Sequence, residues 1–549
     1  MISDIEIRML FETAGEGSSS LSSIKSSHLL DDEASWKLFT THLKVDISLE
    51  PKLIEVGKEI VMKCGGLESQ ISKMSDLLSH QDVPLTHEAW TSVLEGHEFN
   101  EDQRNSWSEA LHKINNNLSP HMRRCLLYFV HFPAEFGIPV RRLVLLWVAE
   151  GLVSHSGEKP PELVAERYLE ELIDRNMVQV VERKYNGKVK TCRLPSPLRQ
   201  LLLTKTNDFR SLQPGQLKGC ISSDRVLDLE GIRMRNLPEH IKIKRLTRLT
   251  YLGLRRTYLH SLPSSVSKLL KLQTLDLKHT YIETLPSSIW NMELRHLFLS
   301  VMQCCKFPPP PKRHSLSDLQ TLLGLCIDVE APVKNGLDKL VNIKKLGLEC
   351  QSMPPEEEEA MTPQLEAVAD WIATLEHLQS LRLTSVRGYG KCLNLHLKSF
   401  ENNINLTDMF LMGSLSSSSV LLSQFPQSLV KLTLGHSKLA IDPMITLKDF
   451  PNLQKLYLFG ESYTGTTMVC KSQSFPKLLV LKFRNLENLE AWKIDPGALP
   501  SLQSLAIEMC PRLQMLPDGL KHVNTLLELK LVNNAGPDNI PPNCQVYRK

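Results

Sequence analysis

Leucine residues recur at a fixed spacing in the second half of the chain. Leu249, Leu252 and Leu254 are followed by Leu259 and Leu262. The same positions are apolar 23 residues later, at Leu272, Leu275, Leu277, Ile282 and Leu285. This period is typical of a leucine-rich repeat, in which each unit is a short strand followed by a return segment. One unit cannot bury its own leucines, so the pattern predicts stacked units and a solenoid with a concave face of strands.

The strand part of this pattern continues to the C-terminus. Most steps between successive strands are 22 to 25 residues, but the step from Leu346 to Leu381 is 35, which predicts an insertion. The acidic run Pro354–Glu359 lies in this insertion and is expected to be a solvated loop. The first apolar residues of the expected strands are Leu227, Leu252, Leu275, Leu297, Leu322, Leu346, Leu381, Met409, Leu432, Leu456, Leu481, Leu505 and Leu529.

The first 117 residues carry helical patterns instead. Acidic residues before an apolar run predict a helix that begins near Asp32. Leu53, Val56 and Ile60 share one face of a helix expected over Pro51–Cys64, with proline at its start and glycine after its end. Further helices are expected over Gln70–Ser79, from Trp90 onward, and over Trp107–Ile114.

Helices followed by a hairpin are expected next, between Leu118 and Leu203. The apolar run Cys125–Val130 predicts one helix, and Val140–Trp147 has the spacing of an amphipathic second helix that ends at Gly151. A third stripe runs from Ala165 to Ile173. Asn186-Gly187 then separates two strand-like runs, Met177–Val181 and Val189–Leu194, which predicts a β-hairpin. A last helix is expected over Leu198–Leu203, and this order of elements is the outline of a winged helix.

Composition and charge narrow the classes of partner. The 64 Lys and Arg residues nearly balance the 61 Asp and Glu residues, for a net charge of +3, so neither nucleic acid nor an anionic membrane surface is expected as a partner. Arg123-Arg124 and Arg141-Arg142 lie on expected winged-helix helices, but no basic stripe continues from them, so we expect a structural role there.

Targeting and redox signals favour a cytoplasmic protein. The first 25 residues contain acids and no long apolar run, which argues against a secretory signal. No run of 18 apolar residues is present, so no membrane span is expected. The 12 cysteines form no CxxC pair and are expected to be reduced thiols, and the 18 histidines show no metal-ligand spacing. With no identifiable catalytic set, the sequence predicts a protein that is not an enzyme and has no metal site.

Several blocks together resemble one known family, the plant intracellular disease-resistance proteins that join a nucleotide-binding NB-ARC module to leucine-rich repeats (NLR proteins). Asp32–Phe39 resembles the block at the end of the family's nucleotide-binding domain. Cys125–Ile138, Leu146–Val153 and Ala165–Leu172 resemble its winged-helix motifs. The resemblance covers nearly the whole chain from about residue 28.

The resemblance implies an α+β multidomain fold. A remnant helical NB-ARC module and a winged helix would precede a leucine-rich-repeat α/β solenoid, or horseshoe. The expected divisions are 1–45, the tail end of a nucleotide-binding domain; 46–117, a helical (ARC) domain; 118–205, a winged-helix domain; 206–224, a linker; and 225–549, leucine-rich repeats.

The chain departs from the family at the positions that bind nucleotide. Intact members bind ADP or ATP, and their phosphate-binding loop Gly-x-x-x-x-Gly-Lys-Ser/Thr is absent from this sequence. Glu68 stands in the Gly-Leu-Pro-Leu-Ala motif, and Pro195 and Ser196 replace the His and Asp of the Met-His-Asp motif. Proline has neither an N–H nor a side-chain donor. We therefore expect no bound cofactor and an N-terminally truncated, nucleotide-independent relative; a truncated gene prediction is the alternative for the missing loop.

Basic residues gather at the non-leucine positions of the early repeats, which should face the concave surface. They suit an acidic protein partner or docking of the repeats on residues 1–205, as the family resemblance implies. A solvated strand face without a fixed partner is the equally weighted alternative. The candidate partner-binding residues are Arg255, Arg256, Lys278, His279, Arg295, His296, Lys344 and Lys345.

These expectations converge on recognition. The chain is expected to act in plant defence and innate immunity by recognising a pathogen effector, a host guardee or another NLR protein through its repeats, without nucleotide switching of its own. The alternatives are a fragment of an intact ADP/ATP-switching receptor and a generic leucine-rich-repeat adaptor.

Overall fold

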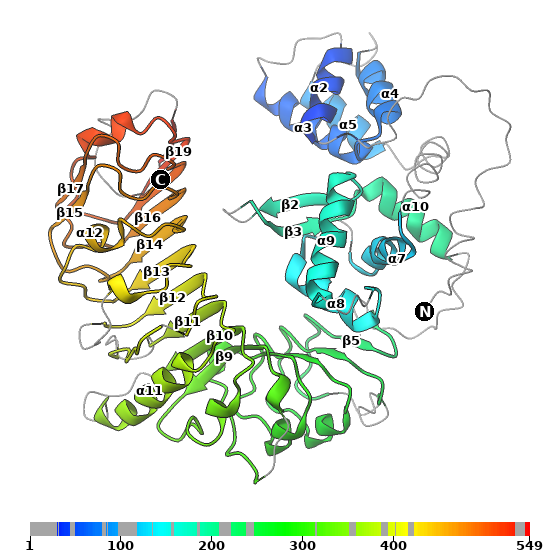
Figure 1. The fold of residues 1–549 in the computed structure, drawn as a ribbon. Coiled ribbons are helices and arrows are strands. Elements are labelled where there is room, and N and C mark those ends of the chain that lie inside the picture. Colours follow the sequence, from blue (N-terminus) through cyan, green and yellow to red (C-terminus); the bar gives the residue numbers. More distant parts are fainter. Residues whose placement is uncertain are drawn as a thin grey trace. The chain divides into compact units, whose positions relative to one another are not determined.

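The computed structural model of the chain divides into two compact units, Met1–Leu227 and Asp228–Lys549. Each unit is considered by itself (Figure 1). The structure describes residues 30, 32–43, 50–79, 84, 86–96, 118–133, 136–154, 159–183, 187–207, 221–237, 246–312, 316–350, 358–385, 393–400, 402–415, 422–532 and 544–548. Four of the predicted features lie wholly or partly outside these ranges. They are the helix Trp107–Ile114, residue Asn186 of the turn, residues 354–357 of the acidic run, and most of the linker.

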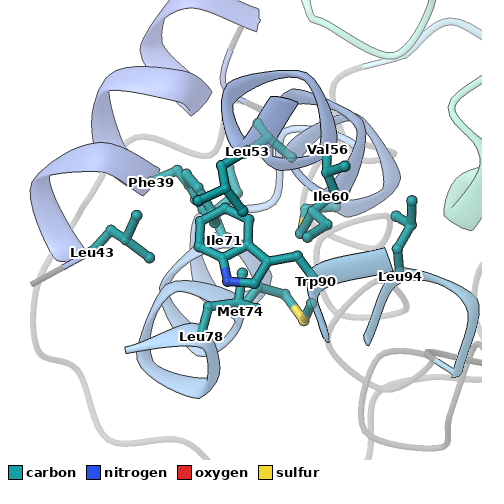
Figure 2. Close-up of a cluster of buried hydrophobic side chains, with 12 residues drawn as sticks. Phe39, Leu43, Leu53, Val56, Ile60, Ile71, Met74, Leu78, Trp90 and Leu94 are labelled. Carbon is teal, nitrogen blue, oxygen red and sulfur yellow. The ribbon is translucent and has the colours of Figure 1, made fainter. Parts of the chain in front are cut away.

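Four helices begin the first unit: α2 (Asp32–His42), α3 (Pro51–Cys64), α4 (Glu68–Leu78) and α5 (His87–Gly96). The predicted helix Pro51–Cys64 is confirmed, with proline in its first turn and Gly65 in the left-handed conformation after its end. Side chains from all four helices form one buried core around Trp90 (Figure 2). Gly57 permits this packing, because a Cβ atom there would lie 3.2 Å from the rings of both Trp36 and Trp90.

The predicted winged helix is confirmed between Pro120 and Asn207. Its helices are α7 (Pro120–Tyr128), the 3-10 turn η1 (Phe129–His131), α8 (Val140–Glu150), α9 (Pro161–Asp174) and α10 (Ser196–Asn207). Strands β1 (Ile138–Pro139), β2 (Gln179–Arg183) and β3 (Val189–Arg193) form an antiparallel sheet in the order β1-β3-β2. Helix α10 is longer than the predicted span of Leu198–Leu203, because Ser196-Pro197 already suits a first helical turn.

Two short strands close this unit, β4 (Ile221–Ser222) and β5 (Val226–Asp228), although β5 ends one residue past the division. The first of them lies in the stretch predicted to be a linker.

The second unit is a parallel sheet whose strands follow one another in chain order (Figure 1). Every expected apolar residue from Leu252 to Leu529 pairs with its equivalent in the next repeat, so the predicted repeat is confirmed strand by strand. The strands are β6 (Tyr251–Gly253), β7 (Thr274–Asp276), β8 (His296–Phe298), β9 (Thr321–Ile327), β10 (Lys345–Cys350), β11 (Ser380–Thr384), β12 (Asp408–Met412), β13 (Lys431–Gly435), β14 (Lys455–Phe459), β16 (Val480–Arg484), β18 (Ser504–Glu508), β19 (Glu528–Val532) and β20 (Gln545–Arg548).

Return segments connect these strands on the other side of the leucine core. Several are single 3-10 turns, such as η3 (Ser264–Lys268), η4 (Ser287–Asn291) and η9 (Asp518–His522). Strands β15 (Thr467–Cys470) and β17 (Ala491–Ile494) form a small parallel sheet of their own, and α12 (Pro443–Leu447) begins at Asp442, whose carboxylate accepts a hydrogen bond from the Met444 N–H.

Two local features of the repeats were not predicted. Strand β9 contains an extra residue at Gly324, whose φ of 88° suits glycine, and Leu325 takes the place of the second strand leucine. Glu358 and Glu359, expected in a solvated loop, instead begin helix α11 (Glu358–Ala373). The helix forms because Met361, Leu365, Val368 and Ile372 give it a buried apolar face at helical spacing.

The strand residues that alternate with the buried leucines form what we call the open strand face. On β14, for example, Leu456 and Leu458 are fully buried, whereas Tyr457 and Phe459 between and after them are partly exposed. Figure 1 shows these strands along the inner side of the repeat unit.

Candidate functional site

The three positions that depart from the family's nucleotide motifs lie at the starts of two helices. Glu68 is the exposed first residue of α4, and it follows the left-handed pair Gly65-Gly66. The Gly66 carbonyl accepts a hydrogen bond of 2.8 Å from the Leu30 N–H, and a Cβ atom on Gly66 would lie 2.3 Å from the Leu30 oxygen. This turn therefore holds the segment before α2 by backbone contacts.

Pro195 and Ser196 begin α10, and the nearby cation there is already engaged. Pro195 is buried, and its carbonyl accepts a hydrogen bond from the Arg199 N–H. The Arg199 guanidinium donates to the Phe132 carbonyl at 2.8 and 3.1 Å. Partial burial lowers the pKa of Arg199. Arg199 thus stabilises the packing of the winged helix.

The eight predicted partner-binding residues occupy four different backbone positions. Arg255 and Lys278 directly follow the second strand leucine and lie on the open strand face. Arg256 and His279 come one residue later, in left-handed turns with φ of 56° and 58°. Arg295 and Lys344 precede their strands, while His296 and Lys345 are first strand residues. The set is therefore divided between the two ends of the strands and does not form one row.

Acidic residues partly neutralise the positive charges of Arg255 and Arg256. The Arg255 guanidinium lies 3.1 Å from the Asp276 carboxylate, and that of Arg256 lies 3.9 Å from Glu230. Burial, followed by the charges of Arg255, Arg256 and Lys278, lowers the pKa of His279, and the opposing charge of Asp276 does not compensate. Arg255, Arg256 and Lys278 thus oppose protonation of the imidazole at this turn.

Not every member of the set offers surface to a partner. His296 is only 8% exposed, and its ring lies 3.1 Å from the Thr321 hydroxyl. The Lys278 ammonium lies over the Phe298 ring at 5.6 Å, and the Lys344 ammonium donates to the Gln320 side-chain oxygen at 3.1 Å. Of the two arginines that form ion pairs here, Arg256 is the more accessible, with 64% of its side chain exposed against 23% for Arg255.

A second charged cluster lies on the open strand face of the last repeats. The nearly buried Glu508 carboxylate accepts hydrogen bonds of 2.8 Å from Lys482 and 2.9 Å from Lys530, and Arg484 lies 3.9 Å away. Burial alone would raise the pKa of Glu508, but the hydrogen bonds and charges of the two lysines outweigh it and lower the pKa. Three cations around one carboxylate leave this part of the face positive.

The sequence contained a signal for this cluster. Lys482 and Lys530 both stand between the two apolar residues of their strands, and the 24-residue period places them on the same row of the face. The early repeats carry basic residues at these positions, whereas the later ones mix cations with Tyr457 and Glu508, and Lys482 and Lys530 come together only through strand pairing. Among the residues that the structure describes, no group of three His, Cys, Asp or Glu side chains could hold a metal ion, and none of the helices there is long and apolar enough to cross a membrane.

Two parts of the chain match known families. Residues 132–202 match the family described as "Disease resistance protein Winged helix domain". Residues 218–536, more than half of the chain, match the family described as "Leucine-rich repeat region". The fold and these matches define a leucine-rich-repeat protein that carries a winged helix before its repeats.

Curated relatives narrow this class. "Probable disease resistance RPP8-like protein 2" of Arabidopsis thaliana is 27% identical over 92% of this chain and 61% of its own length. "Disease resistance protein RPP8" of the same plant is 26% identical over 95% of this chain and 63% of its own length. The chain belongs to the leucine-rich-repeat family, and it is similar to plant disease-resistance proteins, of whose length it spans about three fifths.

Solved structures add a weaker likeness. A leucine-rich-repeat protein of Leptospira interrogans is 20% identical to this chain over 58% of it and 83% of its own length, with a TM-score of 0.37. This score is too low to carry an argument about function.

Proposed function

We propose that this chain acts in plant defence as a receptor-like protein that recognises a pathogen effector, or a host protein changed by one, through the open strand face of its repeats. The relatives are plant disease-resistance proteins, which supports a role in defence. The recognition step is the proposal.

The observation that carries the proposal is that buried leucines alternate along each strand with residues on the open strand face. The leucines of neighbouring repeats pair in register and are buried, for example Leu456 with Leu481 and Leu481 with Leu505. The residues between them leave the sheet on the other side and differ from repeat to repeat, as Tyr457, Lys482 and Ala506 do. A surface whose chemistry varies on a constant scaffold is suited to binding a specific protein.

A loss-of-function plant line tests this proposal. Removing the gene should lower resistance to at least one pathogen, and the wild-type chain should restore it. A variant with Arg382→Ala, Tyr457→Ala and Lys530→Ala on the open strand face should fail to restore it. The matched control is Lys493→Ala, because Lys493 is exposed on β17 in the return side. Unchanged resistance to every pathogen tested, or full rescue by the triple variant, would contradict the proposal.

We further propose that the chain does not switch with nucleotide by itself. Glu68, Pro195 and Ser196 supply none of the groups that the family uses at those positions. Purified protein should carry no ADP by chromatography of the heat-released supernatant, and calorimetry should detect no binding at micromolar ADP. ADP co-purified at close to one molecule per chain would overturn this second proposal. It would favour the alternative of an ADP/ATP-switching receptor.

A further inference from the structure

Cations and aromatic rings lie close to one another on the open strand face of the later repeats. The residue between the two apolar positions of each strand pairs with its equivalent in the next strand. We call this series the middle row, and it consists of Arg382, Phe410, Thr433, Tyr457, Lys482, Ala506 and Lys530. The last row, two residues further along each strand, consists of Thr384, Met412, Gly435, Phe459, Arg484, Glu508 and Val532.

Aromatic rings in these rows make cation–π contacts with neighbouring cations. The Arg382 guanidinium lies 4.3 Å from the centre of the Phe410 ring, and the Lys482 ammonium lies 6.0 Å from that of Phe459. The rings of Tyr457 and Phe459 are stacked at 5.9 Å, which makes one partly exposed aromatic surface. Cation–π contacts orient the charged groups and leave their remaining donors to the outside.

The two rows together carry a net positive charge. Four of their positions are basic, namely Arg382, Lys482, Arg484 and Lys530, and Glu508 is the single acid. Glu508 is nearly buried and is already engaged by three of these cations. Arg382, Arg484 and Lys530 are exposed. The rows therefore present an excess of positive charge beside apolar rings, which complements acidic side chains next to an aromatic or aliphatic one.

We propose that the middle and last rows of β11 to β19 bind an extended acidic segment of the partner protein, with an apolar residue seated on Tyr457 and Phe459. This inference rests on the proposed function and specifies the chemistry of the recognised partner. Single-stranded nucleic acid also binds cations and rings, but it needs a continuous basic track for its phosphates. Here the first residues of the same strands include the acids Asp408 and Glu528 as well as Lys431 and Lys455, so no continuous basic track forms, and the chain carries a net charge of only +3.

The spacing of the rows sets the spacing of the partner's groups. Neighbouring strands lie about 4.8 Å apart, and an extended chain advances about 3.3 Å per residue. Lys482 and Lys530 are two strands apart in the sheet, so carboxylates about three residues apart on a crossing segment would meet both. Tyr457 lies on the strand directly before Lys482, which places the apolar residue one to two residues from the first carboxylate.

Peptide binding to the full chain tests the inference. The probe is a synthetic peptide of about twelve residues, enough to cross the rows when extended. It has glutamate at every third position and one phenylalanine. The control peptide has the same sequence with glutamine in place of each glutamate. Fluorescence anisotropy should show binding of the acidic peptide that weakens with added salt and is at least tenfold tighter than that of the glutamine peptide. Equal binding of the two peptides, or tighter binding of an oligouridine of the same charge, would overturn the proposal.

Charge reversal locates the site. Lys482→Glu with Lys530→Glu should weaken the acidic peptide at least tenfold, whereas Lys493→Glu on the return side should not. Because the first variant places new carboxylates beside Glu508, a second one, Arg382→Glu with Tyr457→Ala, changes the rows away from that cluster and should weaken binding comparably. Unchanged affinity in a folded second variant sinks the acidic-segment proposal. If the plant line nevertheless loses resistance, the proposed function stands with a partner of different chemistry.

Discussion

The hydroxyl of Ser223 donates a hydrogen bond of 2.8 Å to the carboxylate of Glu150, which is the buried last residue of α8. The same hydroxyl accepts hydrogen bonds from the N–H groups of Arg225 at 3.2 Å and Val226 at 2.9 Å. Glu150 thus fixes the turn that leads from β4 to β5. The winged helix is joined here to the segment that precedes the repeats through one acidic side chain.

Glu150→Gln should change the pH dependence of stability. Burial raises the pKa of Glu150 above its ordinary value of 4.5, although the Ser223 hydrogen bond and Arg225 oppose the shift. The stability that this group contributes is therefore present in full below pH 4.5 and is lost as the pH rises through the raised pKa. The free energy of unfolding of the wild type, relative to Glu150→Gln, should fall as the pH rises above 4.5 in urea titrations followed by tryptophan fluorescence. The control Glu166→Gln changes an exposed residue of α9. A difference that is constant with pH would contradict this account.

Glu508→Gln should have the opposite dependence. The lysines lower the pKa of Glu508, so its contribution is present above pH 4.5 and is lost as the pH falls through the lowered pKa. At pH 7 the variant leaves three cations without their shared carboxylate, and we expect a loss of about 1–3 kcal/mol in the unfolding free energy of the repeats. The loss should shrink toward pH 3. Glu487→Gln, at an exposed position of the preceding repeat, is the control. A loss at pH 7 no larger than that of the control would count against the cluster.

Gly519→Ala should destabilise the last repeats. An added Cβ would lie 2.0 Å from the Ile494 carbonyl oxygen of β17, and backbone cannot move as a flexible side chain does. We expect a loss of about 1–3 kcal/mol, measured by thermal unfolding. Gly137→Ala is the matched control, because its Cβ would meet Thr191 and Val181 at an ordinary 3.6 Å. Equal melting curves for the two variants would show that η9 can shift away from β17.

Trp90→Ala should unfold the helical module at lower denaturant concentration. Trp90 is fully buried, and its ring packs edge-on against Phe39 with centroids 6.3 Å apart (Figure 2). Removing a buried aromatic side chain costs about 3–5 kcal/mol. Hydrogen exchange of α2 to α5 should increase while that of β12 to β19 stays unchanged. Leu77→Ala, at a half-exposed position of α4, should leave exchange nearly as in the wild type.

Arg255→Glu with Arg256→Glu tests docking of the early repeats on residues 1–205. A protease site inserted within residues 208–220 allows the chain to be cleaved after it has folded. If docking occurs, the wild-type halves should co-elute in gel filtration at low salt and the double variant should separate, because charge reversal removes the attraction. Lys268→Glu with Lys271→Glu reverses two exposed charges in the return segment that leads to the next strand. Co-elution of the double variant to the same extent as the control would reject the docking hypothesis.

The sequence predicted most of this fold because its signals were periodic. The leucine spacing located every strand of the large parallel sheet from β6 to β19 but not β15 and β17 of the small one, and Pro51 and Gly65 marked both ends of α3. Gly324 was missed because one extra residue within β9 interrupts the strand pattern. Helix α11 was missed because an acidic run masked the apolar stripe that follows it.

The candidate site was less predictable than the fold. Arg255 and Arg256 are neighbours in sequence, but a left-handed φ at Arg256 turns its backbone away from the strand. Lys482, Arg484 and Lys530 meet around Glu508 only because three strands pair in register. Such meetings depend on tertiary pairing and leave no adjacent signal in the chain.

The alternation of buried leucines with outward side chains also bears on how such a chain can evolve. Replacing Leu481 or Leu505 would damage folding, whereas Lys482 or Ala506 beside them can change with little effect on the interior. Selection for a new target can therefore act on one set of codons while purifying selection holds the other. A lineage could in this way explore many binding specificities without passing through unfolded intermediates.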